Sequence, residues 1–356
     1  MRRAWRRQPA ALLLALTFCG CAAIPWPQGP RAPHGARSAE GWLDLRGVVH
    51  VHTRGSHDSP GTIAEVVAAA RSAGVAWVAI TEHTRPGVLG AYGVIDGVIV
   101  LPGFETSAVG GSLLALGVTE KPPATKDPGE LVRWTHAQGG VAVVGHFERS
   151  RLAEPEAWRA AAPDAVELVN LHANAERARG SLAWRAPLLP ATTALRALLR
   201  LRESNLASWE RLPGPPPLVG AVDAHAKFRL LGPLGGTVDR YRDLFRLLTT
   251  HVLARDASAP AILEALRAGR SYLAFEGLSV VDAFRFEPVA GGFALEAPRA
   301  ARLALVCDGA RAAEAEAQRA VLAPPTGARR CRAEASLGSR AWILTSYRAV
   351  VPMSLP

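Results

Sequence analysis

The stretch Arg46-Gly47-Val48-Val49-His50-Val51-His52 decides how this sequence of 356 residues is interpreted. Its run of β-branched residues predicts a short buried strand. Because side chains two residues apart leave the same face of a strand, His50 and His52 are placed to hold one metal ion together. Thr62 and Glu65 follow a polar turn and form a capping box, which predicts the start of a helix. The stretch therefore predicts a strand that ends in a metal site.

Six further apolar runs have the same character. They cover residues 77–80, 98–101, 113–118, 141–144, 166–170 and 218–222. Their alternation with helical patterns predicts an α/β barrel. An Arg/Leu/Ala-rich segment, residues 175–215, predicts a helical insertion that could cover one barrel mouth. After helical stretches near 238–249 and 259–268, short strands and turns predict a small C-terminal β-rich domain.

The composition is that of a packed soluble protein, with 49% hydrophobic and 20% charged residues. Collagen-like and wholly disordered chains are thereby excluded. The formal net charge is +10, from 41 Lys and Arg against 31 Asp and Glu. Only three of the 41 are lysines, and the arginines stand mostly singly among alanines, so the charge does not predict a nucleic-acid surface.

Residues 1–21 are similar to a lipoprotein signal peptide. Four arginines precede the apolar run 10–18, which is too short for a membrane span. The tetrapeptide FCGC at 18–21 resembles a lipobox in which Cys21 is the acylated residue. Ordinary signal-peptidase cleavage near Ala22-Ala23 is the alternative. We expect an exported protein with a lipid anchor in the membrane, an outer-membrane or periplasm-facing lipoprotein.

The rest of the chain divides into three segments. Residues 22–41 contain Pro and Gly without apolar periodicity and predict a flexible linker. Residues 42–270 hold the predicted barrel, and residues 271–356 the β-rich domain. Removal of the signal and lipidation of Cys21 leave Cys307 and Cys331 as an even pair. An oxidising compartment permits a disulfide between them, with two buried thiols as the alternative.

Ionisable residues recur at the C-terminal ends of the predicted strands. In chain order they are the turn residues His57 and Asp58, then His83, Glu105, His146, Asp223 and His225. Each alone has a structural interpretation as a helix cap or a hydrogen-bonded strand-end residue. Together they predict a polynuclear metal site, because barrel enzymes build their active sites at this end. Imidazole and carboxylate without cysteine favour Zn, Mn or Fe.

The order and spacing of these motifs resemble the PHP (polymerase and histidinol phosphatase) domain over residues 46–225, roughly half of the chain. The flanking sequence, notably Trp209 and residues 250–253, is similar to exported, carbaryl-hydrolase-like members. The resemblance implies a distorted seven-stranded (β/α) TIM-like barrel with a metal centre at its C-terminal mouth. It also implies two or three divalent transition-metal ions, Zn, Mn or Fe.

The resemblance further implies how the ligands are shared. A first metal would be held by His50, His52, Glu105 and Asp223, a second by Glu105 and His146, and a third by His57, His83 and His225. For the turn ligand, His57 is favoured over Asp58. Ser112 stands where the family usually has a ligating His, so the second site is expected to be weak, completed by water, or empty. Glu105, which bridges two metals, and Asp223, which would manage a proton, are the expected catalytic residues.

The expected reaction is ester hydrolysis by a metal-bridging hydroxide. The expected substrate is a small-molecule ester, phosphorylated in the leading interpretation. Arg54, Arg149 and Lys227 adjoin ligand motifs and are candidate substrate-binding residues, with solvated surface cations as the alternative. A hydrolase of carboxylic or carbamate esters, a PHP-type exonuclease and a non-catalytic metal-binding surface lipoprotein remain alternatives.

Two of the rival interpretations are disfavoured by the residues themselves. An amidohydrolase with a carbamylated lysine would need a lysine at a strand end, and only Lys227 is near one. Nucleic acid is not an expected partner, because no aromatic residues are placed to stack bases. Structural roles are favoured for His136, His172 and His251, although His172 could reach the mouth. The sequence predicts no oligomeric state.

Overall fold

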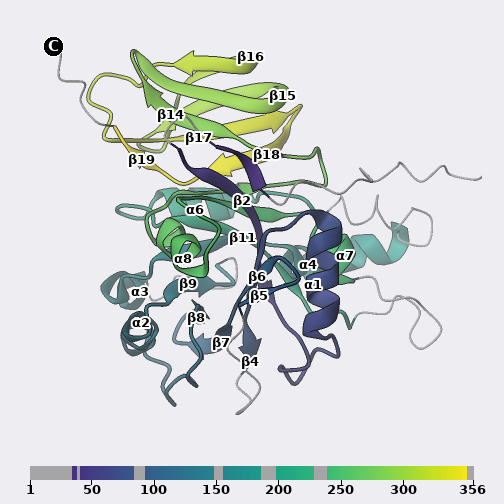
Figure 1. Cartoon of the computed structure of the whole chain (residues 1–356). Helices are drawn as coiled ribbons and strands as arrows, with labels where there is room; N and C mark the ends of the chain where they lie inside the picture. Colours follow the sequence, from purple (N-terminus) through teal and green to yellow (C-terminus); the bar gives the residue numbers. More distant parts are fainter. Residues whose placement is uncertain are drawn as a thin grey trace, which may run out of the picture.

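The computed structural model describes residues 34–37, 41–83, 93–147, 155–185, 198–227 and 239–350. The predicted signal peptide with Cys21, and the candidate substrate residue Arg149, lie outside the described residues. Figure 1 shows an α/β part below and an antiparallel sheet of C-terminal strands above it. The predicted mixed α/β class is confirmed.

Each predicted apolar run forms a strand. The strands of the α/β part are β1 (His34–Arg37), β2 (Leu43–Val51), β3 (Trp77–Ile80), β4 (Glu82–His83), β5 (Val94–Ile95), β6 (Val98–Leu101), β7 (Gly103–Ala108), β8 (Gly111–Leu116), β9 (Val141–Gly145), β10 (Ala165–Asn170), β11 (Leu218–Ala224), β12 (Thr249–Ala254) and β13 (Ser271–Ala274). Most are buried along their whole length, which explains their continuous apolar sequence.

The strand pairings of the α/β part return to their starting point. β2 is parallel to both β3 and β11, β3 to β6, β4 to β7, and β10 to both β9 and β11. Strand β8 closes the ring between β7 and β9, antiparallel to both. It departs from the strand–helix alternation expected of a (β/α) barrel, because a tight turn at Val109-Gly110 joins it directly to β7. Gly110 has φ 76°, which such a turn requires.

The helices of the α/β part are α1 (Ile63–Ala73), α2 (Pro128–Ala137), α3 (Pro155–Ala161), α4 (Leu171–Arg185), α6 (Glu203–Glu210), α7 (Tyr241–Leu244) and α8 (Ala259–Arg267). Thr62 and Glu65 form the predicted capping box at the start of α1. The predicted insertion 175–215 is helical in α4 and α6. Within the described residues, no helix has both the length and the apolar character needed to cross a membrane.

β1 and β12 lie outside the predicted apolar runs, and both pair with the first half of β2. β1 lies inside the predicted linker 22–41 and pairs antiparallel with β2 from Leu43 to Leu45. β12 pairs antiparallel with residues 43–47 of β2, so α7 is shorter than the predicted helix 238–249. Because β3 and β11 cover only the second half of β2, the backbone groups of its first half need these additional partners.

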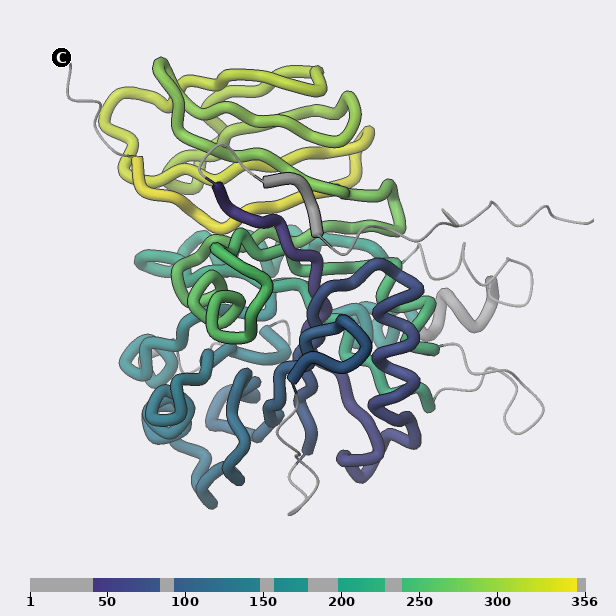
Figure 2. The backbone as a smooth tube through the Cα atoms, viewed as in Figure 1, coloured from purple at the N-terminus to yellow at the C-terminus, as the bar shows by residue number. Residues whose placement is uncertain are grey.

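The remaining strands form the antiparallel sheet in the upper part of Figure 2. They are β14 (Arg285–Val289), β15 (Gly292–Cys307), β16 (Ala310–Leu322), β17 (Arg330–Leu337), β18 (Arg340–Thr345) and β19 (Arg348–Ala349). β13 pairs with β12 on one side and β18 on the other, so it links the two parts. Leu253 and Tyr272 share one buried cluster with Leu303 and Trp342, so the sheet packs on β12 and β13.

Cys307 and Cys331 form a disulfide between directly paired positions of β15 and β17. Both residues are buried, and they lie 24 positions apart in sequence. The disulfide therefore joins two neighbouring strands of the C-terminal sheet, and the loop that it closes contains β16.

Replacing both cysteines by serine is expected to lower the free energy of unfolding by about 3 kcal/mol, the chain-entropy value for a loop of this length. Urea unfolding of the oxidised protein and of the double variant measures the difference. Reduced wild-type protein is the control and should unfold near the variant. Equal midpoints for the oxidised protein and the variant would contradict a stabilising disulfide.

A buried polar cluster holds β2, β12 and β13 together. His251 Nδ1 lies 2.7 Å from Asp44 Oδ1, and the Tyr272 hydroxyl donates to the other Asp44 oxygen. His251 Nε2 lies 3.4 Å from Glu276 Oε1, which forms an ion pair with Arg46 Nε at 2.8 Å. Burial alone lowers the pKa of His251, but Asp44 and then Glu276 outweigh it and raise that pKa above the ordinary value. His251 is thus the buried structural histidine that the sequence predicts.

His251→Gln is expected to remove a pH-dependent part of the stability. The folded protein holds the His251 proton more tightly than the unfolded chain does. This contribution is therefore fully present below the unfolded pKa of about 6.5 and is lost as the pH rises through the raised folded value. Urea unfolding between about pH 5.5 and 9 should show a difference from wild type that is largest in acid and narrows in alkali. His136→Gln, at an exposed histidine, is the control, and a difference independent of pH would refute the assignment.

Candidate metal centre

The strand ends bring the predicted ligands to one end of the ring. His50 and His52 come from the end of β2, His83 from β4 and Glu105 from β7, while His146 follows β9. Asp223 and His225 come from the end of β11. Figure 1 shows β4 and β7 at the end of the molecule away from the C-terminal sheet. Because parallel strands present their carboxyl ends on the same side, the chain gathers these residues without any long loop.

Three of these ligands have a backbone conformation that non-glycine residues rarely adopt. The φ angles are 67° for His50, 47° for His146 and 52° for Asp223. Strand register shifts between Val48 and Val51 on β2, and between Ala221 and Ala224 on β11. Left-handed residues at these irregularities re-aim the side chains, and each is unfavourable by about 1–2 kcal/mol. Such strain persists where the surrounding structure enforces it, and it clusters at functional sites.

The Nε2 atoms of His50 and His52 lie close to one oxygen of Glu105 and one oxygen of Asp223. Glu105 Oε2 lies 3.1 Å from His50 Nε2 and 3.4 Å from His52 Nε2. Asp223 Oδ1 lies 3.5 and 3.6 Å from the same two nitrogens. Nitrogen and oxygen ligands about 2.0–2.1 Å from a tetrahedral zinc ion are about 3.4 Å apart. These nitrogen–oxygen distances suit a bound ion. His50, His52 and Glu105 form one ligand group, whereas Asp223 forms another with His50 and His146.

The second oxygens of both carboxylates point toward His146. Glu105 Oε1 lies 3.1 Å and Asp223 Oδ2 3.7 Å from His146 Nε2. Glu105 therefore contacts His50 and His52 through one oxygen and His146 through the other, and it would hold an ion on either side. Ser112 packs on Gly145, where an added Cβ would lie 2.5 Å from Ser112 Oγ. The Ser112 hydroxyl is buried without a hydrogen bond.

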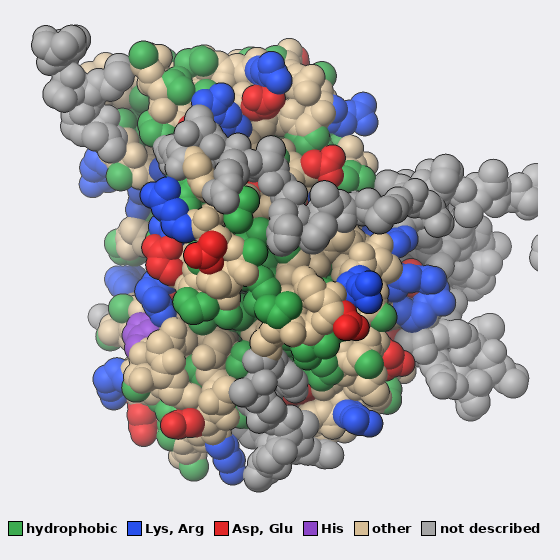
Figure 3. Space-filling view, viewed as in Figure 1, with side chains coloured by type: hydrophobic (Ala, Val, Ile, Leu, Met, Phe, Trp, Pro, Cys, Tyr) green, Lys and Arg blue, Asp and Glu red, His purple; other side chains and the backbone are tan. Residues whose placement is uncertain are grey.

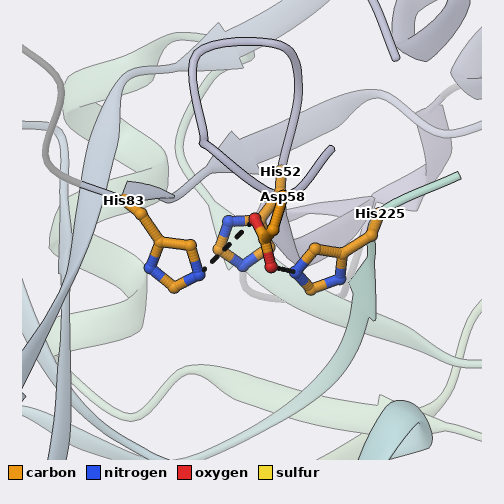
Figure 4. A group of neighbouring side chains, drawn as sticks. All are labelled: His52, Asp58, His83 and His225. Carbon is orange, nitrogen blue, oxygen red and sulfur yellow. Dashed lines mark ion pairs between the residues drawn. The ribbon is translucent and has the colours of Figure 1, made fainter. Parts of the chain in front are cut away.

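The third group contains His52, Asp58, His83 and His225, drawn in Figure 4. Asp58 lies between two imidazoles, with its oxygens 3.0 Å from His225 Nε2 and 3.8 Å from His83 Nε2. His57 is exposed and belongs to none of the ligand groups. The His57 ring nevertheless lies 5.1 Å from that of His83. The geometry favours Asp58 as the turn ligand, and the choice of His57 stays a prediction.

Unpaired buried atoms test whether an ion fits. His52 Nε2, Asp58 Oδ1 and Asp223 Oδ1 are buried and have no hydrogen-bond partner. Buried polar atoms normally have a partner, and all three belong to the ligand groups. A donor set of imidazole nitrogens and carboxylate oxygens is one that Zn, Mn or Fe accepts. The residues present fit bound transition-metal ions.

The histidines and carboxylates of the centre shift one another's pKa values. Burial alone lowers the pKa of His50, but the surrounding carboxylates, Asp223 first, raise it well above its ordinary value. Burial alone raises the pKa values of Glu105 and Asp223, but His50 and neighbouring imidazoles hold both well below their usual range. Burial and His52 lower the pKa of His225 to about 3. The carboxylates are ionised, and in the metal-free protein a proton supplies the charge that an ion would supply.

Two residues outside the predicted set orient these ligands. Glu167 on β10 is buried, and its Oε2 lies 2.7 Å from His50 Nδ1. The Asn170 amide donates to Glu167 Oε1 at 2.6 Å and to Asp223 Oδ2 at 3.2 Å. A glutamate within the apolar run 166–170 was the available signal, because a buried carboxylate needs a partner. With Nδ1 bound to Glu167, His50 presents Nε2 to the ligand group.

His52 is oriented in the same way by a different carboxylate. Its Nδ1 lies 3.1 Å from Ser56 Oγ, which donates to Glu82 Oε2. The backbone N–H of Thr53 also donates to Glu82, at 3.1 Å. Glu82 thus fixes both the turn after β2 and the ring of His52. The motif Thr81-Glu82-His83 predicts a functional role for His83 alone, so this role of Glu82 is a finding of the structure.

Some of the remaining candidate residues lie at the metal centre and others do not. Lys227 Nζ lies 2.9 Å from Asp58 Oδ2 at the edge of the third group, whereas Arg54 is exposed. The His172 ring lies 5.6 Å from that of His225, so His172 does reach the mouth. His136 instead contacts Asp164, with Nε2 2.8 Å from its carboxylate, and belongs to none of the ligand groups, which agrees with its predicted structural role.

Comparison with family models and with curated proteins finds no match. Among solved structures, the chain is similar to a two-domain protein from Bacteroides vulgatus containing a predicted PHP-like metal-dependent phosphoesterase, with 15% identity and a TM-score of 0.43 over 90% of this chain and 92% of that chain. It is also similar to a metal-dependent phosphoesterase candidate from Bifidobacterium adolescentis, with 17% identity and a TM-score of 0.32 over 54% of this chain and 90% of that chain.

Glu167→Gln is expected to weaken zinc binding about tenfold, because it removes the charge that orients His50. Competition titration against a chromophoric chelator measures the affinity without reference to any activity. Glu287→Gln changes a buried carboxylate of the C-terminal sheet and is the matched control, for which no loss is expected. Equal affinities of the two variants would show that Glu167 does not support the metal centre.

Proposed function

We propose that this chain is a metal-dependent hydrolase of the PHP family that cleaves ester bonds, with phosphoesters as the leading substrate class. The main support is the convergence of eight ionisable side chains in three overlapping groups with spacings suited to divalent ions. Those that would hold the ions are His50, His52, Asp58, His83, Glu105, His146, Asp223 and His225. Zn, Mn and Fe are the candidate ions.

The side chains of the site differ in what they could do in such a reaction. Divalent ions, when bound, would lower the pKa of a nearby water and neutralise charge that develops on the ester oxygens. Glu105 would hold two ligand groups at a fixed separation through its two oxygens. Asp223, with Oδ2 held by the Asn170 amide and Oδ1 unpaired, is the residue we propose to accept or return a proton.

The direction of substrate entry follows from exposure. His50 and His52 are fully buried, whereas the side chains of His146 and His83 are 14% and 28% exposed. A substrate would therefore approach from the side of His83 and His146. Lys227 contacts Asp58 of the third group, and the exposed Arg54 follows His52 by two residues. We propose that these two cations attract an anionic phosphoester.

The partner and location proposals come from the sequence. We propose a small-molecule substrate rather than nucleic acid. On the face shown in Figure 3, Lys and Arg side chains are scattered among acidic and apolar ones, which supports this choice. We also propose that the protein belongs to the exported, carbaryl-hydrolase-like branch and is anchored as a lipoprotein through Cys21, as the apolar run 10–18 and the following FCGC indicate.

One observation favours a second candidate function. Ser112 pairs with Gly145, the neighbour of His146, and stands where the PHP family usually has a ligating histidine. The group around His146 would therefore lack one strong ligand. A centre with one tightly held ion could bind metal without turning over an ester. A non-catalytic metal-binding lipoprotein is therefore the competing proposal.

Elemental analysis and three hydrolysis assays on one preparation distinguish the two proposals. The assays use p-nitrophenyl phosphate, bis-p-nitrophenyl phosphate and p-nitrophenyl acetate. We expect two or more bound transition ions and turnover of a phosphoester, lost after chelation and restored by Mn or Zn. His52→Ala should reduce turnover to background, whereas His136→Ala should not change it. One ion or none, with no turnover after metal is restored, would overturn the hydrolase and favour the binding protein.

A further inference from the structure

A cavity lies where the loop after α6 meets β19. Residues 213–215 form one wall, and Arg329, Arg330, Tyr347 and Arg348 form the other. The cavity has a volume of about 500 Å³, within the range of small-molecule sites. In Figure 1, β19 belongs to the upper sheet, whereas β4 with its ligand His83 is at the opposite end. The cavity is therefore separate from the metal centre.

The wall of this cavity is strongly cationic. Three arginines line it, and none of the described residues that line it is acidic. Asp308 Oδ1 lies 3.9 Å from the Nε atoms of both Arg329 and Arg330, too far for a hydrogen bond. Arg332 on the same strand differs, since it is 2% exposed and paired with two glutamates. Asp308 is therefore shared as an ion pair between Arg329 and Arg330, so one carboxylate balances only part of the charge of these two guanidinium groups.

Arg330 is held in place by a rigid support. Its guanidinium lies 5.0 Å from the centre of the Tyr347 ring, which stacks on the fully buried Trp209. The Arg330 side chain is only 26% exposed, and its Nε is buried without a hydrogen bond. Gly214, at φ 64°, brings the opposite wall close, because a Cβ there would lie 3.8 Å from Arg330 Nη1. A fixed guanidinium with an unsatisfied buried donor points to an acceptor that none of the described residues provides.

We propose that this cavity binds a phosphate-bearing ligand. Arg329, Arg330 and Arg348 would hold the phosphate, because planar guanidinium groups donate paired hydrogen bonds to its oxygens. The Tyr347 ring and the prolines of 213–215 would contact the remainder of the ligand. The site is independent of the proposed hydrolase activity, and neither requires the other.

Calorimetric titration of the full chain with pyrophosphate tests the proposal. The protein is first stripped of metal with a chelator, so that the metal centre does not bind the probe. We expect saturable binding that Arg330→Gln weakens about tenfold or more, the loss typical of a charged hydrogen bond. Arg319→Gln is the matched control, because Arg319 is exposed and paired with Glu296 on the same sheet. Arg348→Gln provides a second variant, and thermal unfolding checks that each variant folds.

A second measurement identifies the source of the phosphate. The protein is sedimented with vesicles of phosphatidylglycerol and phosphatidylcholine. Loss of vesicle binding in Arg330→Gln but not in Arg319→Gln would assign a phospholipid headgroup, whereas pyrophosphate binding alone would assign a soluble ligand. Both results support the site. No saturable binding to either probe, or equal binding by the Arg330 and Arg319 variants, would overturn it.

Discussion

The contacts of the Glu105 carboxylate are the interaction on which the candidate centre depends. It is buried, and its two oxygens lie 3.1 Å from His50 and 3.1 Å from His146. A buried carboxylate is strongly unfavourable unless charged or hydrogen-bonding groups surround it. The imidazoles meet that requirement only if β2 and β9 end in positive-φ residues that aim them inward. Backbone strain and a buried carboxylate, each unfavourable alone, therefore occur together in one arrangement, and a bound cation would balance the charge of the carboxylate.

Strand β2 shows how the fold supports this strain. Its second half pairs with β3 and β11 and ends at the strained His50. Its first half pairs with β1 and β12 and carries Asp44 and Arg46, which bind the cluster around His251. The strained end of the strand is thus continuous with an end that is paired on both edges. Stability at one end permits strain at the other, as is general for functional sites.

Much of this could be predicted because it is local. The α1 capping box, the apolar runs and the strand-end position of the ligands depend on spacing within a few residues. β1 and β12 could not be predicted in the same way, since their pairing is determined by the needs of β2 far away in the chain. The choice between His57 and Asp58 depended on how one turn rotates, which spacing does not determine. The role of Glu167 could not be predicted, because its place within an apolar run does not show which side chain it contacts.

The arrangement of charges also explains why a basic composition gave little guidance. Arginines of this chain serve different purposes according to depth: Arg46 and Arg332 are buried and paired with carboxylates, whereas Arg329 is largely exposed. Net charge sums these cases and so conceals them. The grouping of Arg329, Arg330 and Arg348 arises only when β17 and β19 pair and the loop 213–215 packs opposite them. A cationic cavity of this kind is a property of the tertiary structure, in contrast to the histidines, whose regular strand-end positions already indicate a metal centre.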